Sequence, residues 1–249
     1  GGTGILAIAA ALAGAKVTLL EINTETEKRT REFIEFLGLS EKITVVFANA
    51  RNYIPNEKID IIVCECLHTG LALEPQLQIL NNLGKFLKPR GKILPEGVTL
   101  RWSLADVDWS NIQEPHTEFR NLGKQLHSKG EWSEDTHVNF YDSIGKEEIE
   151  DIRFTMPVDT LSANTILVEM DTIIYREDNC TLMLRSGEAE FLGHPHAIKL
   201  KNVVDPSVGT HVSITIKPGI NFPDYVQPIS RKVIRTQSEL QKKRDINLN

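Results

Sequence analysis

Two glutamates stand close together just beyond an apolar run that is typical of a buried strand. Glu65 follows the segment 61–64, and Glu74 comes nine residues later, with His68 between them. Two buried carboxylates near one another raise each other's pKa unless a cation or a shared proton offsets the repulsion. The pair therefore predicts a site for a cationic ligand, and His68 is a candidate base for a ligand that must lose a proton.

Each of these residues also has a purely structural interpretation. Glu65 could cap the turn after its strand, and Glu74 could begin the next helix, where the helix dipole favours an acid. His68 could be an ordinary surface residue of the loop. Open α/β sheets bind ligands at the carboxyl ends of their strands, which favours a role in binding for Glu65.

A second candidate site lies at the first residues. Gly2, Thr3 and Gly4 precede an Ala-rich segment that predicts a helix, so the backbone can approach a ligand and free N–H groups can face it. Glu21 ends the next predicted strand, where doubly wound folds hold ribose hydroxyls. Loop and acid together predict a site for an adenosine-containing cofactor, and a tight turn without a ligand is the alternative.

The third predicted strand ends at Asn49 and Ala50. The Asn49 amide could form a hydrogen bond with an adenine amino group, and the Ala50 N–H could form one with a ring nitrogen. A capped turn explains this segment equally well. A nicotinamide dinucleotide is the alternative cofactor. A protein that binds such a dinucleotide usually has a third glycine in its glycine-rich loop, at the position of Ala7 in this sequence. Some dinucleotide-binding folds tolerate alanine there.

Alternating strands and helices over the first hundred residues would position these groups. The predicted strands are 16–22, 42–48, 58–65 and 91–104, and the predicted helices are 5–13, 23–39 and 75–89. Strands that are apolar on both faces, separated by helices, indicate a parallel sheet covered on both sides, which is a doubly wound α/β domain. In the second helix we expect Phe33, Ile34, Phe36 and Leu37 to face the core. A sheet built around the glycine loop also needs a strand before Gly1, and we expect one upstream.

The second half has a different pattern. From residue 154 to about 235, short extended runs recur between Gly, Pro, Asp and Asn, which predicts an antiparallel sandwich or barrel. The predicted organisation is a nucleotide-binding α/β domain over residues 1–102, followed by a β-rich domain over residues 103–249.

Composition narrows the classes of function. A net charge of -6 argues against nonspecific binding to nucleic acid or to anionic membranes. The apolar run 5–15 is too short to span a bilayer. The three cysteines, Cys64, Cys66 and Cys180, suit a reducing compartment, so we expect a cytoplasmic location and no bound metal.

Three segments carry a family resemblance. They are GGTGILAIAAALAGAKVTLLEIN, ITVVFANARNYIPNEKIDIIVCE and LGKFLKPRGKILPEGVTL. They resemble the successive motifs of class I S-adenosylmethionine-dependent methyltransferases, and more closely those of the protein arginine methyltransferases. In that family a Rossmann-like domain precedes a β-barrel domain, and the nine-residue interval from Glu65 to Glu74 equals that of its double-glutamate loop. The resemblance covers roughly residues 1–102.

The resemblance implies an enzyme with S-adenosylmethionine as its cofactor. Glu65 and Glu74 would grip a guanidinium with paired hydrogen bonds and polarise it for methyl transfer. It also implies a protein or peptide acceptor and a homodimer. From composition and charge we expect no membrane partner and no nucleic-acid partner. The alternatives are methylation of a small molecule or of another peptide group, and a non-catalytic scaffold with the same fold. The residues expected at the cofactor are Gly2, Thr3, Gly4, Glu21, Ile22, Asn49, Ala50 and Glu65.

Overall fold

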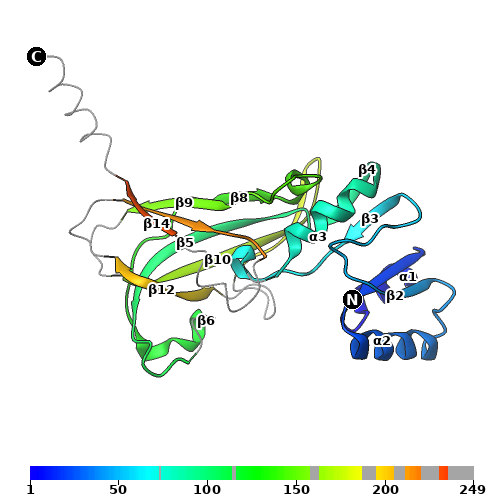
Figure 1. Cartoon of the computed structure of the whole chain (residues 1–249), viewed down its shortest axis with the longest axis horizontal. Coiled ribbons are helices and arrows are strands. Elements are labelled where there is room, and N and C mark those ends of the chain that lie inside the picture. The colour runs from blue at the N-terminus through cyan, green and yellow to red at the C-terminus, as the bar shows by residue number, and fades with distance from the viewer. Residues whose placement is uncertain are drawn as a thin grey trace, which may run out of the picture.

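The computed structural model has an N-terminal half of alternating helices and parallel strands and a C-terminal half of antiparallel strands (Figure 1). The two halves lie end to end along the long axis of the molecule. The structure describes residues 1–72, 74–113, 116–157, 163–186, 195–204, 211–219 and 230–234.

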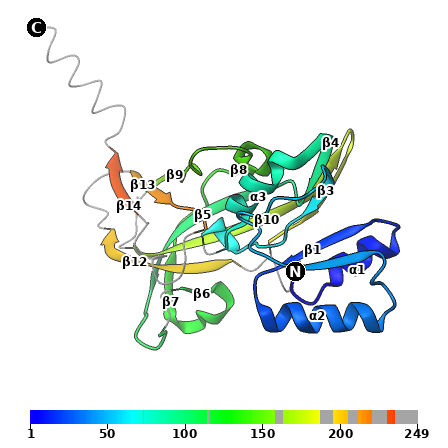
Figure 2. The same cartoon turned by 45° about the vertical axis from the view of Figure 1, so that its right-hand side comes forward.

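The first half contains the predicted helices and strands with two differences: the helix predicted over 75–89 ends at residue 83, and the run predicted as one strand over 91–104 is divided between two strands. In chain order the elements are α1 (Ile5–Leu12), β1 (Val17–Glu21), α2 (Thr24–Phe36), β2 (Ile43–Phe47), β3 (Ile59–Val63), the short 3-10 turn η1 (Thr69–Leu71), α3 (Gln76–Leu83), η2 (Gly84–Phe86) and β4 (Leu87–Leu94). β1 pairs with β2 and β3 pairs with β4, each in parallel. In the residues that the structure describes, these are two separate two-stranded sheets (Figure 2).

Helix α2 begins where the sequence supplies a cap. The Asn23 side-chain oxygen accepts a 3.0 Å hydrogen bond from the backbone N–H of Thr26. One turn later, Glu25 and Arg29 form an ion pair of 3.0 Å on the exposed surface. These local contacts fix the start and the solvent face of the helix that closes over β1 and β2.

The apolar face of α2 is narrower than the sequence indicates. Ile34 is buried with 2% of its surface exposed, but Phe33, Phe36 and Leu37 are 46%, 83% and 41% exposed. The expectation that all four face the core is therefore wrong for three of them. Thr30 and Ile34 lie four positions apart on the side of the helix that faces the sheet, whereas Phe36, two positions after Ile34, lies on the opposite side.

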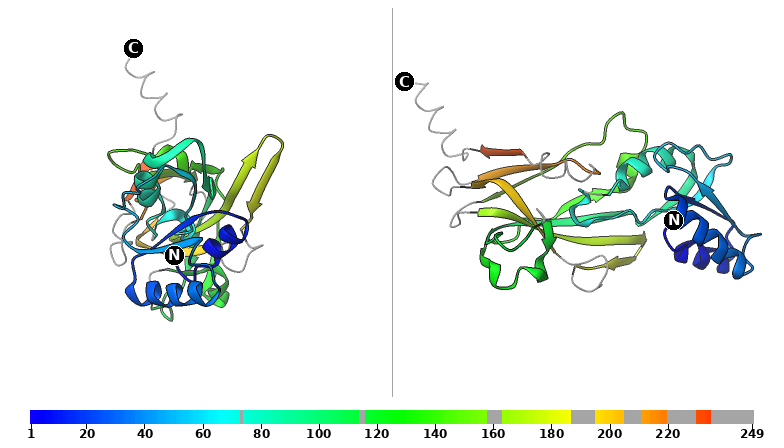
Figure 3. Two further views of the ribbon diagram at one scale, coloured as in Figure 1. Left: turned by 90° about the vertical axis from the view of Figure 1, so that its right-hand side faces the viewer. Right: turned by 60° about the horizontal axis from the view of Figure 1, so that its bottom comes forward.

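The second half is an antiparallel β structure, as predicted. A seven-stranded sheet has the order β6-β12-β10-β5-β7, with β11 on β10 and β8 on β5, and a three-stranded sheet has the order β14-β13-β9. The larger sheet curls (Figure 3). The elements are β5 (Gly97–Val107), β6 (His116–Glu118), η3 (Phe119–Asn121), η4 (Gly123–Gln125), β7 (Leu126–Lys129), β8 (Thr136–Asn139), η5 (Phe140–Ser143), β9 (Ile152–Pro157), β10 (Ala163–Glu177), β11 (Cys180–Leu184), β12 (His196–Val204), β13 (His211–Ile216) and β14 (Ser230–Ile234).

Strand β5 carries the chain from one half into the other. It pairs with β10 from Gly97, opposite Ile173, to Ala105, opposite Thr165. The predicted domain boundary after residue 102 falls inside this strand. The change of sheet occurs between β4 and β5, because β4 pairs with β3 whereas β5 pairs with β10.

The largest core joins the two halves. Leu80 of α3, Trp102 of β5 and Ile166 of β10 are fully buried members of one cluster. A separate cluster lies between α1, α2, β1 and β2, and includes Leu19 and Ile34. Helix α3 and strand β3, which flank the two glutamates, therefore pack in the same core as the curled sheet.

Within the part of the chain that the structure describes, no helix combines the length and the apolar character needed to cross a membrane.

Candidate functional site

The glycine loop contacts the acid at the end of β1. The backbone N–H of Gly2 donates a 2.9 Å hydrogen bond to Glu21 Oε2. On the other side of the loop, the Thr30 hydroxyl of α2 donates a 2.7 Å hydrogen bond to the Gly2 carbonyl. Gly4 has φ 78°, and a Cβ there would come within 3.0 Å of the Thr30 methyl group. The loop is thus held between β1 and α2 and requires glycine at position 4.

Glu21 is a buried carboxylate that the backbone holds in its ionised form. The N–H groups of Ile22 and Asn23 donate to Glu21 Oε1 at 2.9 and 2.8 Å. Burial by itself raises the pKa of Glu21, but the hydrogen bonds from Asn23 and Gly2 and the charged amino group of Gly1, 3.2 Å from Oε2, together outweigh burial, and the net pKa lies below the ordinary value. The predicted loop and acid are therefore brought together, and the acid carries its charge.

Asn49 and Ala50 lie beside the same strand end. The Ala48 N–H donates a 2.9 Å hydrogen bond to the Glu21 carbonyl, which continues the pairing of β1 and β2. The Asn49 side-chain oxygen accepts the N–H of Arg51 at 3.0 Å, so this residue forms the capped turn that the sequence left as an alternative. The turn brings Ala50 to the edge of the sheet occupied by Glu21.

A hollow borders this loop. Its volume is about 430 Å³, and it lies between the glycine loop and one face of α2. The exposed Ile22 side chain stands next to the acid in sequence. The residues that line the hollow are Gly2, Thr3, Thr26, Arg29, Thr30 and Phe33.

The two glutamates lie at the two ends of the segment between β3 and α3. Glu65 stands two residues beyond the last residue of β3, and Glu74 stands two residues before the first residue of α3. Both residues reach solvent, and the Glu65 carboxyl is also partly enclosed by protein. Partial burial raises the pKa of the Glu65 carboxyl, and the charge of Glu74 raises it further. The structure thus places both carboxylates within electrostatic reach of each other, as a cation site requires.

His68 faces the second half of the molecule. Its ring lies edge-on to the ring of His196, the first residue of β12, with centroids 4.8 Å apart and an interplanar angle of 68°. Close by, the N–H of Gly219 donates a 3.0 Å hydrogen bond to the Leu71 carbonyl. The loop between the glutamates is therefore held against the C-terminal half.

Two buried or half-buried amides were not found from the sequence. Asn82 of α3 donates hydrogen bonds to the carbonyls of Ala50 and Tyr53, at 3.0 and 2.8 Å. Gln76, the first residue of α3, is fully buried and contacts the backbone on both sides of Glu65. The available signal was a polar residue at the spacing of the apolar positions, since Gln76 precedes Leu80 by four residues.

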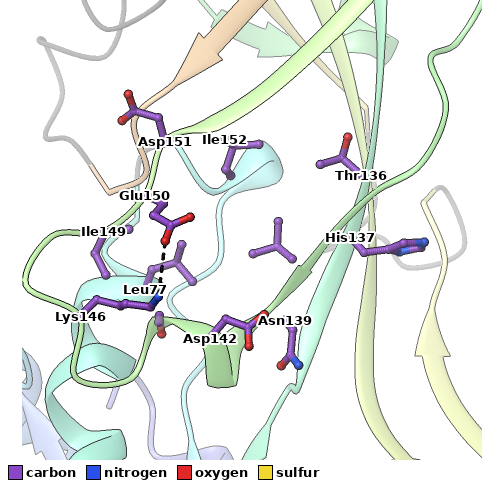
Figure 4. A pocket seen from close by; sticks show the side chains of 12 residues that line it. Leu77, Thr136, His137, Asn139, Asp142, Lys146, Ile149, Glu150, Asp151 and Ile152 are labelled. Atoms are coloured by element: carbon purple, nitrogen blue, oxygen red, sulfur yellow. Dashed lines mark hydrogen bonds and ion pairs between the residues drawn. The ribbon is translucent and has the colours of Figure 1, made fainter.

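A second hollow, of about 270 Å³, lies between α3, η5 and the segment that leads into β9 (Figure 4). Figure 4 shows Lys146 reaching Glu150, an ion pair of 3.4 Å, beside the apolar side chains of Leu77 and Ile149. The described residues around this hollow include none of the predicted site residues.

Cys64, Cys66 and Cys180 are free thiols. In the described residues, no group of three His, Cys, Asp or Glu side chains has an arrangement that could hold a metal ion.

Residues 1–91 match the family model of a methyltransferase domain. An uncharacterised protein of Methanocaldococcus jannaschii is 33% identical over 113 residues, which cover 45% of this chain and 43% of that protein. A probable protein arginine N-methyltransferase 6.1 of Oryza sativa subsp. indica is 35% identical over 119 residues, covering 47% of this chain and 31% of the relative. Residues 1–91 are therefore similar to a methyltransferase domain, and the relatives that align with them include proteins named as probable protein arginine methyltransferases.

Solved structures of protein arginine methyltransferases share the fold. Arabidopsis thaliana protein arginine methyltransferase 10 superposes with a TM-score of 0.61 at 15% identity, over 86% of this chain and 76% of that one. The Trypanosoma brucei PRMT1 enzyme-prozyme complex with AdoHcy gives 0.56 at 17% identity, over 86% and 75%. The predicted order, a Rossmann-like domain and then a β-rich domain, is confirmed. The aligned regions span less than half the length of the sequence relatives named above.

Proposed function

We propose that the protein is an S-adenosylmethionine-dependent methyltransferase. The observation that carries the proposal is the 2.9 Å hydrogen bond from Gly2 to Glu21, within a segment that matches a methyltransferase domain. It joins the glycine loop to a buried, ionised acid, and both groups suit an adenosine-containing ligand.

The residues present fit this cofactor. A carboxylate has about four acceptor positions, so Glu21 can hold the loop backbone and still accept hydrogen bonds from ribose hydroxyls. In this proposal Asn49, Ala50 and the exposed Ile22 would contact the adenine, and Gly2, Thr3 and Gly4 would line the methionine portion. S-adenosylmethionine supplies, when bound, an electrophilic methyl group on a sulfonium centre.

We further propose that the acceptor is a cationic group, with a protein arginine as the first choice. Glu65 and Glu74 together carry two negative charges at one exposed site, and a guanidinium would relieve the repulsion that raises the pKa of Glu65. The two carboxylates would hold and orient the acceptor nitrogen, and positioning supplies much of the rate of such a transfer. The sequence relatives named as arginine methyltransferases support the same choice.

The partners are proposed on the same grounds. A protein acceptor fits the exposure of both glutamates, and assembly into an oligomer is supported by the Trypanosoma neighbour, which is a heterotetrameric complex. A homodimer is the assembly that we propose for this chain.

Titration calorimetry with S-adenosylmethionine tests the cofactor, with Glu21→Gln as the variant and the exposed Glu25→Gln as its control. A charged hydrogen-bond partner contributes about 1.5–3 kcal/mol, so Glu21→Gln should weaken binding by about 10- to 100-fold. Glu25→Gln should bind like the wild type. A chain that binds no S-adenosylmethionine contradicts the proposal, and a melting temperature raised only by a nicotinamide dinucleotide favours the alternative cofactor.

The acceptor is tested with radiolabelled S-adenosylmethionine and two peptides that differ only in arginine or lysine at one position. Label transferred to the arginine peptide, and lost in Glu65→Gln, supports the arginine acceptor. Label transferred only to small molecules favours the alternative function, methylation of a small molecule. Cofactor binding without transfer to any acceptor favours the non-catalytic scaffold.

A further inference from the structure

Gln76 makes two hydrogen bonds that bracket Glu65. Its side-chain N–H donates to the Cys64 carbonyl at 2.8 Å, and its side-chain oxygen accepts the Cys66 N–H at 3.0 Å. The residue is fully buried. One amide thus holds the backbone immediately before and immediately after Glu65.

The same residue is next to the second glutamate. Gln76 stands two positions after Glu74 and is the first residue of α3. The chain between the glutamates is irregular, with left-handed conformations at Gly70 and Leu71, where φ is 79° and 58°. The two bonds of Gln76 are therefore a far shorter link between Glu65 and Glu74 than the intervening loop.

The amide is the chemical group that this position needs. The Cys64 carbonyl requires a donor and the Cys66 N–H requires an acceptor, and glutamine offers both on one planar group. An ionised glutamate would offer acceptors only, so it would repel the Cys64 carbonyl. A protonated carboxyl can donate and accept, as the amide does.

We propose that Gln76 is a positioning residue that sets the placement of Glu65 relative to Glu74. The inference rests on the proposed function, in which these two acids hold the acceptor. It assigns no contact with the acceptor to Gln76 itself. Its effect passes through the backbone of Cys64 and Cys66.

The first test compares Gln76→Met with Asn81→Ala. Methionine keeps the length of the side chain and loses both hydrogen bonds. Asn81→Ala is the matched control, because it removes a hydrogen bond of 2.9 Å from the same helix to the Lys146 carbonyl, away from the glutamates. NMR titration of the Glu65 carboxyl is the readout, and it requires no enzymatic activity.

We expect the pKa of Glu65 to fall toward its ordinary value in Gln76→Met and to stay raised in Asn81→Ala. Without the two hydrogen bonds of Gln76, the Glu65 side chain moves away from Glu74 and into water. Burial and the charge of Glu74, which both raise its pKa, then have less effect. An unchanged Glu65 titration in Gln76→Met overturns the proposal. This result differs from failure of the proposed function, which would appear as loss of S-adenosylmethionine binding by the wild-type chain.

Kinetics give a second readout. Misplacement of a reacting group by about 1 Å costs about 100-fold in rate, so kcat should fall by about 10- to 100-fold in Gln76→Met. The affinity for S-adenosylmethionine should stay within about twofold of wild type, because Gln76 makes no contact with the glycine loop or Glu21. A lowered melting temperature with unchanged kcat would show a role in stability alone and overturn the proposal.

If Gln76→Met does not fold, Gln76→Glu takes its place, because it adds no cavity. The Glu65 resonances should match wild type when the new carboxyl is protonated and shift away as it ionises. Resonances that match wild type at every pH overturn the proposal.

Discussion

The N–H of Gly2 donates a 2.9 Å hydrogen bond to Glu21, which joins the glycine loop directly to the end of β1. The bond gives Glu21 two tasks. It fixes the loop in the free protein, and it presents a charged oxygen to whatever the loop binds. Stability and ligand affinity are therefore linked at one carboxylate.

Glu21 should make stability depend on pH. Its folded pKa lies below the ordinary value of 4.5, so its contribution to stability is present above that pH and is lost as the pH falls through the folded pKa. Urea unfolding should show the wild type more stable than Glu21→Gln near pH 7, with the difference shrinking toward about pH 3. Glu25→Gln, at an exposed site, should show little difference at either pH. A difference between wild type and Glu21→Gln that stays constant with pH contradicts this assignment.

Protonation of Glu65 should make the methylation rate fall at low pH, which gives the pH–rate profile an acid limb. Its pKa is raised above 4.5 by partial burial and by Glu74, and its protonated form cannot pair with a cationic acceptor. The rate should therefore fall as the pH drops through a value above 4.5. Replacing Glu74 by Gln removes the neighbouring charge, so this limb should move to lower pH even though turnover is reduced. A limb that stays in place would show that another group titrates.

The thiols on either side of Glu65 should differ in reactivity. A hydrogen bond between the two side chains, together with burial, raises the pKa of Cys64 well above its ordinary value. The same contact lowers the pKa of Cys66. Iodoacetamide near pH 8 followed by peptide mass spectrometry should find Cys66 and the exposed Cys180 modified well before Cys64. Equal labelling of Cys64 and Cys66 would contradict the assignment.

Two apolar residues of α2 should differ in their contribution to stability. Ile34 is 2% exposed, and Ile34→Ala should lower the free energy of unfolding by about 2–5 kcal/mol. Phe36 is 83% exposed, and Phe36→Ala should change it by no more than about 0.5 kcal/mol. Urea denaturation monitored by circular dichroism measures both. A large loss in Phe36→Ala would mean that another surface covers this residue.

Local patterns were sufficient to predict most elements of the fold. The apolar runs that became β1, β2 and β3 and the capped segment that became α2 are signals carried by neighbouring residues. The loop Gly2–Gly4 and Glu21 were predicted to belong to one cofactor site because such sheets bind ligands at their strand ends. The structure joins the two by a hydrogen bond from Gly2.

The missed features depend on contacts between distant residues. Nothing in α3 itself indicates that Gln76 bonds to Cys64 and Cys66, or that Asn82 bonds to Ala50, because those partners come from other elements. The exposed Phe36 was missed for the same reason. The pattern of apolar residues in a helix shows which side is apolar. It does not show how much of that side the neighbouring elements will cover.

The separation of the two cores has a mechanical consequence. The glycine loop and Glu21 belong to the packing unit of α1, α2, β1 and β2, whereas Glu65 and Glu74 flank elements packed with the curled sheet. A small rotation of one unit against the other would change the distance between the glycine loop and the two glutamates without deforming either set of residues. Asn82 donates hydrogen bonds to the carbonyls of Ala50 and Tyr53, in the segment between β2 and β3, and so ties that segment to the core of the curled sheet.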